Sequence, residues 1–174
     1  RGEILSSEAP SVPGAASVAG IVPRWEWRTF GERFGAAEGL LDLREVERVA
    51  ETDELYVLSQ ESDASVKVRD TRLDVKRLEA VDGNGLEKWH PVLKGSFPLG
   101  AADLQLVLNA LAVSGERLGR EAYTLAQLLD EVVEATPGLA AAEVHKRRVH
   151  YRLGECLAEL TEVTVGNRSA RTIA

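Results

Sequence analysis

Segments in which apolar and charged side chains alternate with a period of two recur along most of this chain. Such alternation is typical of β-strands that bury one face in a core. The first segment carries Trp25 and Trp27 on one face. Its other face carries Arg24, Glu26 and Arg28. Strands are predicted at 23–30, 55–59, 65–70, 72–80, 86–94, 144–153, 156–165 and from 168 onward.

Helical spacing of apolar residues is confined to three stretches. These are residues 32–49, 101–113 and 125–135. The helices do not alternate with the strands one by one, and turn sequences such as Asp-Gly-Asn-Gly at 82–85 are typical of hairpins. The fold is therefore predicted to be α+β, with a mostly antiparallel sheet.

The chain is predicted to contain one folded domain. Residues 1–21 are rich in Ser, Pro, Gly and small side chains, which predicts a flexible N-terminal segment. Residues 22–174 are long enough for a single core. The run Arg171 to Ala174 reads like the middle of a strand, so we expect the last strand of the domain to lie beyond Ala174.

The net charge and the cysteine content exclude several classes of protein. There are 28 acidic residues against 21 Lys and Arg, a formal net charge of −7, which argues against a nucleic-acid or anionic-membrane binder. A single cysteine, Cys156, excludes a disulfide framework and a cysteine-based zinc site. We expect Cys156, close to Leu157 and Leu160, to be a small buried residue. No signal peptide or long apolar run is present, so a cytoplasmic location is expected.

The common catalytic motifs are absent from the sequence. It contains no Gly-x-x-x-x-Gly-Lys-Ser/Thr phosphate loop, no Gly-x-Ser-x-Gly elbow and no helical His-x-x-x-His pair. Nucleotide hydrolases with a phosphate loop, serine hydrolases of the elbow type and zinc proteases are therefore disfavoured.

The charged faces of the strands are mainly cationic, although the whole chain is acidic. Lys67 and Arg69 share one strand face, and Lys146 and Arg148 share another. For a single strand, a solvated face with cross-strand ion pairs is the simpler interpretation. Repetition over several strands favours a closed or nearly closed β-barrel, with the cations lining a tunnel and the helices packed outside.

A tunnel lined by cations calls for an anionic ligand, because like charges packed together repel. Arg and Lys are the side chains that bind phosphate oxygens best. The candidate phosphate ligands are Arg24, Arg28, Lys67, Arg69, Lys76, Lys88, Lys146 and Arg148. Carboxylates on these strands are predicted to hold Mg²⁺ or Mn²⁺, and the candidates are Glu26, Glu159 and Glu162. Glu26 and Glu159 are the candidate catalytic residues.

The order of the charged motifs is similar to that of one known family. The chain has Arg-Trp-Glu-Trp-Arg at 24–28, Val-Lys-Val-Arg at 66–69, an inward lysine within 73–77, Lys-Arg-Arg at 146–148 and an acidic strand at 156–159. This order resembles the CYTH domain of the triphosphate tunnel metalloenzymes, which include class IV adenylyl cyclases, thiamine triphosphatases and inorganic triphosphatases. Two positions depart from the family's opening Glu-x-Glu-x-Lys motif, with Arg24 in place of the first glutamate and Arg28 in place of the lysine.

The resemblance covers residues 22–174 and implies a β-tunnel that binds a triphosphate or polyphosphate together with a divalent metal. On this hypothesis, bound metal would assist hydrolysis of the phosphate chain. One alternative is a noncatalytic module that binds or senses polyphosphate within a larger protein. A second alternative is a protein-interaction domain whose charged strands are solvated.

Overall fold

The computed structural model describes residues 24–115 and 118–174, and the expected flexible segment 1–21 lies outside them. The main sheet has nine strands in the order β1-β6-β5-β4-β3-β9-β10-β11-β2. They are β1 (Arg24–Glu26), β2 (Thr29–Gly31), β3 (Arg48–Ser59), β4 (Ser65–Arg69), β5 (Arg72–Val81), β6 (Glu87–Ser96), β9 (Leu139–Leu153), β10 (Cys156–Val165) and β11 (Arg168–Ile173). Every neighbouring pair is antiparallel.

Short elements complete the α+β fold. A second sheet pairs β7 (Leu99–Gly100) with β8 (Ala122–Tyr123). The helices are α1 (Ala36–Asp42), α2 (Ala101–Ala110) and α3 (Leu125–Leu128), and α3 continues into the π-helical turn η1 (Leu129–Val133). The prediction of a mostly antiparallel α+β fold is confirmed.

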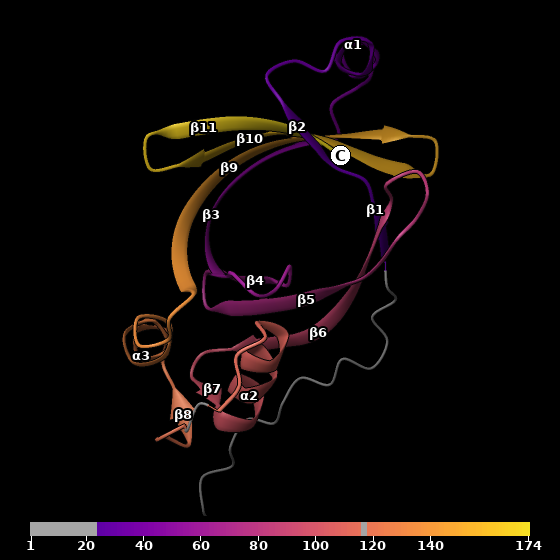
Figure 1. Cartoon of the computed structure of the whole chain (residues 1–174). Helices are drawn as coiled ribbons and strands as arrows, with labels where there is room; N and C mark the ends of the chain where they lie inside the picture. Colours follow the sequence, from indigo (N-terminus) through magenta and orange to yellow (C-terminus); the bar gives the residue numbers. More distant parts are fainter. Residues whose placement is uncertain (1–23, 116–117) are drawn as a thin grey trace, which may run out of the picture.

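The main sheet curves round on itself but does not close into a barrel. In Figure 1, β3 and β9 form one side of the curve, β5 and β6 the bottom, β1 the opposite side, and β10, β11 and β2 the top. The edge strands β1 and β2 do not pair with each other. The prediction of a closed β-barrel is therefore wrong.

The physical reason lies in how the first strand is divided. Residues 23–30 are expected to form one strand, but β1 pairs with β6 and β2 pairs with β11, at the two opposite edges of the sheet. Only Trp27 and Arg28 separate β1 from β2 along the chain. The two edges are thus joined covalently through a two-residue link, without hydrogen bonds between them.

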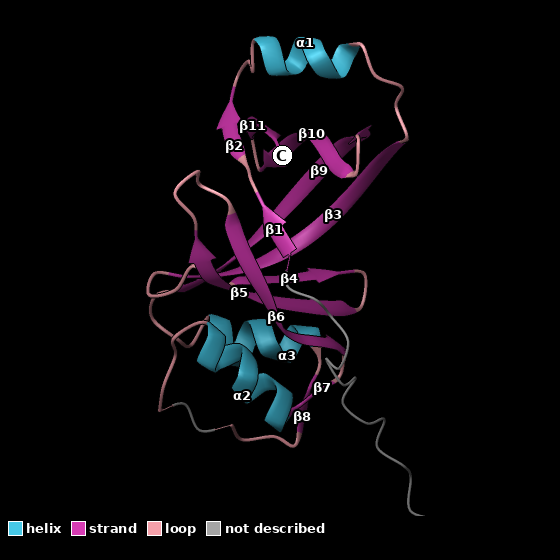
Figure 2. Cartoon of the chain, turned by 90° about the vertical axis from the view of Figure 1, so that its right-hand side faces the viewer, coloured by secondary structure: helices cyan, strands magenta, loops and turns pink. Residues whose placement is uncertain are grey.

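The larger core lies outside the curve, between the sheet and α2 and α3. Figure 2 shows both helices beside β5 and β6. Val66 and Val75 of the sheet and Leu104 and Leu108 of α2 are at most 1% exposed and belong to one cluster. Burying each such side chain contributes about 1.5–3 kcal/mol, so this layer provides much of the stability of the fold. The predicted packing of helices outside the sheet is confirmed here.

A smaller core holds α1 against the same outer face of the sheet, at the end formed by β9, β10 and β11. Leu41 of α1 packs with Tyr151 of β9, Ala158 of β10 and Ile173 of β11. The predicted helix 32–49 is much too long, because its second half belongs to β3 and the loop before it. There, twelve consecutive residue pairs between β3 and β9 outweigh the helical spacing of the apolar side chains.

Three side chains expected in a core are exposed. Trp25 and Trp27 are 51% and 44% exposed, since the helices cover β4 to β6 and leave the outer face of β1 open. Cys156 is also exposed, at the start of β10, where no helix covers it. None of the described helices combines the length and apolar character that a membrane span requires.

Replacing Leu104 with Ala tests the outer core. Leu104 is fully buried, so Leu104→Ala should lower the free energy of unfolding by about 2–5 kcal/mol. Leu43, which is 82% exposed, provides the matched control, and Leu43→Ala should change stability by less than about 0.5 kcal/mol. Urea denaturation measures both. Equal effects of the two substitutions would contradict this description of the core.

Candidate functional site

The concave side of the main sheet encloses a cavity of about 710 Å³. Period-two alternation places every second side chain of a strand on this inner face. In β4, Lys67 and Arg69 line the cavity while Val66 and Val68 are buried in the outer core. The lining Lys and Arg residues are Arg28, Arg48, Lys67, Arg69, Lys76, Lys146 and Arg148.

Most of the predicted site residues do meet in this cavity. The predicted residues among its lining are Glu26, Arg28, Lys67, Arg69, Lys76, Lys146, Arg148 and Glu159. They come from five different strands and from the link between β1 and β2. Segments that are far apart in the sequence therefore contribute to one site. Arg24 shares the inner face with Trp89, its partner in the ladder, but does not line the cavity.

Lys88 lies on the opposite face of the sheet from the cavity. Its neighbours Glu87 and Trp89 line the cavity, and Lys88 forms an ion pair with Glu79 at 3.2 Å. The cause is a β-bulge, because Val75 and Lys76 of β5 oppose Leu93 and Pro91 of β6, which leaves one extra residue in β6. One extra residue reverses the face of every side chain beyond it. The prediction therefore had the two faces exchanged for the part of this strand that contains Lys88.

Glu162 also lies away from the cavity. In the ladder it pairs with Arg147 of β9 and Arg171 of β11, on the face opposite to Glu159 and Thr161. Glu162 and Glu159 are an odd number of residues apart in one strand, so they cannot share a face without a bulge between them. The structure does not bring Glu162 together with the other predicted carboxylates.

Sequence reasoning missed the most buried charge of the site, Glu54 of β3. Its side chain is fully buried, and its carboxylate lies 3.0 Å from Arg148 Nη2, 3.2 Å from Lys146 Nζ and 3.4 Å from Arg69 Nε. The Tyr56 hydroxyl donates a hydrogen bond to it at 2.9 Å. The prediction treated residues 50–54 as a connection between a helix and a strand. The alternation of Arg48, Ala50, Thr52 and Glu54 was the available signal.

The surroundings of Glu54 keep it ionised. Burial alone would raise the pKa of this carboxyl, but the charges of Lys67, Lys146 and Arg148 and the Tyr56 hydrogen bond lower it to about 2. Burial lowers the pKa of Lys67 and of Lys146, although the negative charge of Glu54 acts in the opposite direction and raises both. Burial and the nearby carboxylate raise the pKa of Tyr56, so its hydroxyl stays protonated.

Other cavity cations also have carboxylate partners. Arg28 donates hydrogen bonds of 2.6 Å to both Glu159 and Thr172. Lys76 Nζ lies 3.3 Å from Glu26 Oε1, and Lys67 Nζ lies 3.9 Å from Asp74 Oδ2. Burial would raise the pKa of Glu159, but the Arg28 hydrogen bond lowers it overall.

The cavity nevertheless keeps an excess of positive charge. Seven Lys and Arg residues line it. Against them stand five carboxylates: Glu26, Glu87 and Glu159 in the lining, and Glu54 and Asp74 in contact with its cations. The difference is two positive charges, in a chain whose formal net charge is −7.

The three carboxylates expected to hold a divalent metal do not fit that role as a set. Glu162 faces away from the cavity, while Glu26 and Glu159 are occupied by Lys76 and Arg28. Among the residues that the structure describes, no three His, Cys, Asp or Glu side chains are grouped as metal ligands. The excess positive charge of the lining is of the kind that suits an anionic ligand.

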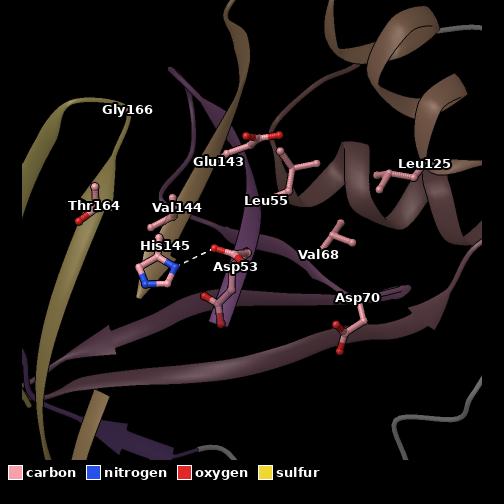
Figure 3. Close-up of a pocket in the computed structure, with 11 residues that line it drawn as sticks. Asp53, Leu55, Val68, Asp70, Leu125, Glu143, Val144, His145, Thr164 and Gly166 are labelled. Atoms are coloured by element: carbon pink, nitrogen blue, oxygen red, sulfur yellow. Dashed lines mark hydrogen bonds and ion pairs between the residues drawn. The ribbon is translucent and has the colours of Figure 1, made fainter. Parts of the chain in front are cut away.

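A second cavity, of about 420 Å³, lies between β3, β9, α3 and the turn after β10. Figure 3 shows His145 and Asp53 facing each other there, 2.8 Å apart, with Leu55, Val68 and Leu125 on the far side. Its described lining has four carboxylates and no Lys or Arg. This cavity is therefore unsuited to a phosphate ligand.

The chain matches no known family model, and no significant match was found among curated proteins.

The pKa of Glu54 predicts how stability depends on pH. A pKa that is lower in the folded than in the unfolded protein stabilises the fold above the unfolded value of 4.5, and this contribution is lost as the pH falls toward about 2. At about 1.4 kcal/mol per pKa unit, it amounts to on the order of 3 kcal/mol. Urea denaturation of the wild type should therefore show a fall in stability from pH 5 to pH 2.

The variant Glu54→Gln should be less stable at pH 7 and should lose less stability on acidification. Glu51→Gln is the control, because Glu51 is an exposed residue on the outer face of the same strand. An equally steep loss in the wild type and Glu54→Gln would contradict the assignment of this pH dependence to Glu54.

Proposed function

We propose that this protein binds a compound with several linked phosphate groups, a triphosphate or a longer polyphosphate, in the cavity inside the main sheet. The observation that supports this function most is the convergence of seven Lys and Arg side chains on one cavity. Lys and Arg donate charge-assisted hydrogen bonds to phosphate oxygens, and these bonds are stronger than those between neutral groups.

The cavity leaves cationic groups available to a ligand. Arg69 uses one side of its guanidinium for Glu54, and its side chain is still 48% exposed. The Lys76 side chain is 30% exposed. The exposed N–H groups of these two side chains are therefore accessible to phosphate oxygens. A volume of about 710 Å³ is also within the usual range of small-molecule sites.

The link between β1 and β2 supports a tunnel-like site on this proposal. Trp27 and Arg28 join the two sheet edges, and Arg28 lines the cavity from this link. A linear phosphate chain would then lie along the axis around which the sheet curves, with cations from β3, β4, β5 and β9 around it. Such a site would recognise its ligand by negative charge and by the length of the phosphate chain, and not by an attached organic group.

Binding without hydrolysis is the form that we favour. Two of the three carboxylates predicted to hold a metal, Glu26 and Glu159, form ion pairs with cations of the protein instead. One observation favours the second candidate, a Mg²⁺- or Mn²⁺-dependent hydrolase. Glu26 and Glu87 lie opposite each other in the β1–β6 ladder and both line the cavity. Like charges in such positions destabilise a sheet unless a cation lies nearby.

Calorimetry with tripolyphosphate tests binding. Lys76→Gln should weaken the affinity about tenfold or more, because a hydrogen bond to a charged group contributes about 1.5–3 kcal/mol. Lys88→Gln is the matched control, since Lys88 also pairs with a glutamate, at 3.2 Å, but on the outer face. Its affinity should stay within about twofold of the wild type. The wild-type affinity should also fall with added salt.

Equal effects of the two lysine substitutions would contradict a ligand inside the cavity. Absence of binding to tripolyphosphate and to longer polyphosphate would contradict the proposed function and favour the protein-interaction alternative.

Phosphate release distinguishes binding from hydrolysis. The wild type is incubated with tripolyphosphate, ATP or thiamine triphosphate, with Mg²⁺ or Mn²⁺, and free phosphate is measured by colour reaction. We expect binding without release. Release that is abolished in both Glu26→Gln and Glu87→Gln, while tripolyphosphate binding persists, would instead support the metal-dependent hydrolase.

A further inference from the structure

We propose that Glu54 is a built-in counterion of the cavity: it stabilises the empty protein and, by the same charge, weakens phosphate binding. This inference rests on the proposed function, because it concerns the ligand of the same cavity. It assigns to Glu54 the role of a residue that sets affinity and selects for highly charged ligands.

The geometry of Glu54 accounts for both parts of this role. One carboxylate oxygen faces Arg148 and Arg69, at 3.0 and 3.4 Å. The other faces Lys146 at 3.2 Å and accepts the hydrogen bond from Tyr56. Both oxygens are thus used, and three of the seven cavity cations share a single carboxylate.

The network around Glu54 holds these groups in place. Arg148 also donates to the Thr52 hydroxyl at 2.7 Å, and Lys146 donates to the Tyr56 hydroxyl. Glu54, Thr52 and Tyr56 are alternate residues of β3, and Lys146 and Arg148 are alternate residues of β9. The β3–β9 ladder places Thr52 directly opposite Lys146. The counterion and its cations are therefore fixed by the same pair of strands.

Glu54 differs from the carboxylates that line the cavity because its side chain is fully buried and is held by four partners. The side chains of Glu26 and Glu159 are 40% and 19% exposed, so solvent and ligand can reach them, whereas the Glu54 side chain is fully buried. A phosphate that contacts Lys146 or Arg148 would therefore bind with the Glu54 charge still in place. Two like charges at such short separation repel strongly in a partly buried site.

The same charge is needed when the cavity is empty. Without it, Arg69, Lys146 and Arg148 would form a cluster of like charges within the wall of the cavity. An unpaired buried charge destabilises a protein more than an exposed one. Glu54 therefore favours the empty state, and only a ligand with several negative charges gains enough from the remaining cations to overcome its repulsion.

The test compares Glu54→Gln with the wild type by calorimetry with tripolyphosphate and by thermal unfolding with and without it. The variant should bind tripolyphosphate on the order of tenfold more tightly at low ionic strength. Its melting temperature should be lower without ligand, and tripolyphosphate should raise it by more than in the wild type. Glu51→Gln, on the outer face of β3, should match the wild type in both measurements.

A second variant covers the case in which Glu54→Gln folds neither alone nor with tripolyphosphate. Asp74 lies 3.9 Å from Lys67, one of the cations that line the cavity, and its side chain is 24% exposed. Asp74→Asn should tighten tripolyphosphate binding by a smaller factor, a few-fold.

The outcomes separate this inference from the proposed function. Wild-type protein that binds no polyphosphate would overturn the proposed function. Wild-type protein that binds, with Glu54→Gln binding equally or more weakly, would overturn the counterion role alone, because Glu54 would then orient the cations for the ligand. If only Asp74→Asn can be measured, tripolyphosphate binding by this variant that is equal to or weaker than that of the wild type overturns the counterion role.

Discussion

The antiparallel pairing of β3 with β9 is the interaction on which the rest of this structure depends. Its twelve residue pairs form the longest ladder of the sheet. This ladder decides which side chains of both strands face inward, and it brings Glu54 within reach of Lys146 and Arg148. Strands on either side then extend the sheet until its two edges meet at the link of Trp27 and Arg28. A cavity lined by charge follows from the register of two strands.

Charge and packing are separated by the two faces of this sheet. The outer face of β4 and β5 supplies valines and leucines to the helices, and stability comes mainly from that side. The inner face carries the cations, and their mutual repulsion is reduced by Glu26, Glu54, Asp74 and Glu159. The stability contributed by the outer core thus offsets the remaining repulsion among the cations of the inner face.

Sequence patterns predicted the strands that have short turns and regular alternation. The bounds of β10, the start of β11 and the inward positions of Lys67, Lys146 and Arg148 follow from period-two spacing alone. The start of β3 could not be predicted in this way, because Val46 and Val49 also fit a helix and only pairing with β9 decides the matter. Glu54 was missed for the same reason. Its importance depends on neighbours about 90 residues away.

The bulge between β5 and β6 has a wider consequence for the cavity wall. One extra residue near Pro91 turns Trp89 toward the cavity and Lys88 away from it. The chemistry of this wall is therefore encoded in strand register as well as in residue identity. Loss or gain of a single residue in β6 would exchange an aromatic wall for a cationic one without the substitution of any residue. Insertions and deletions thus offer this fold a route to new ligands that substitutions at the site do not.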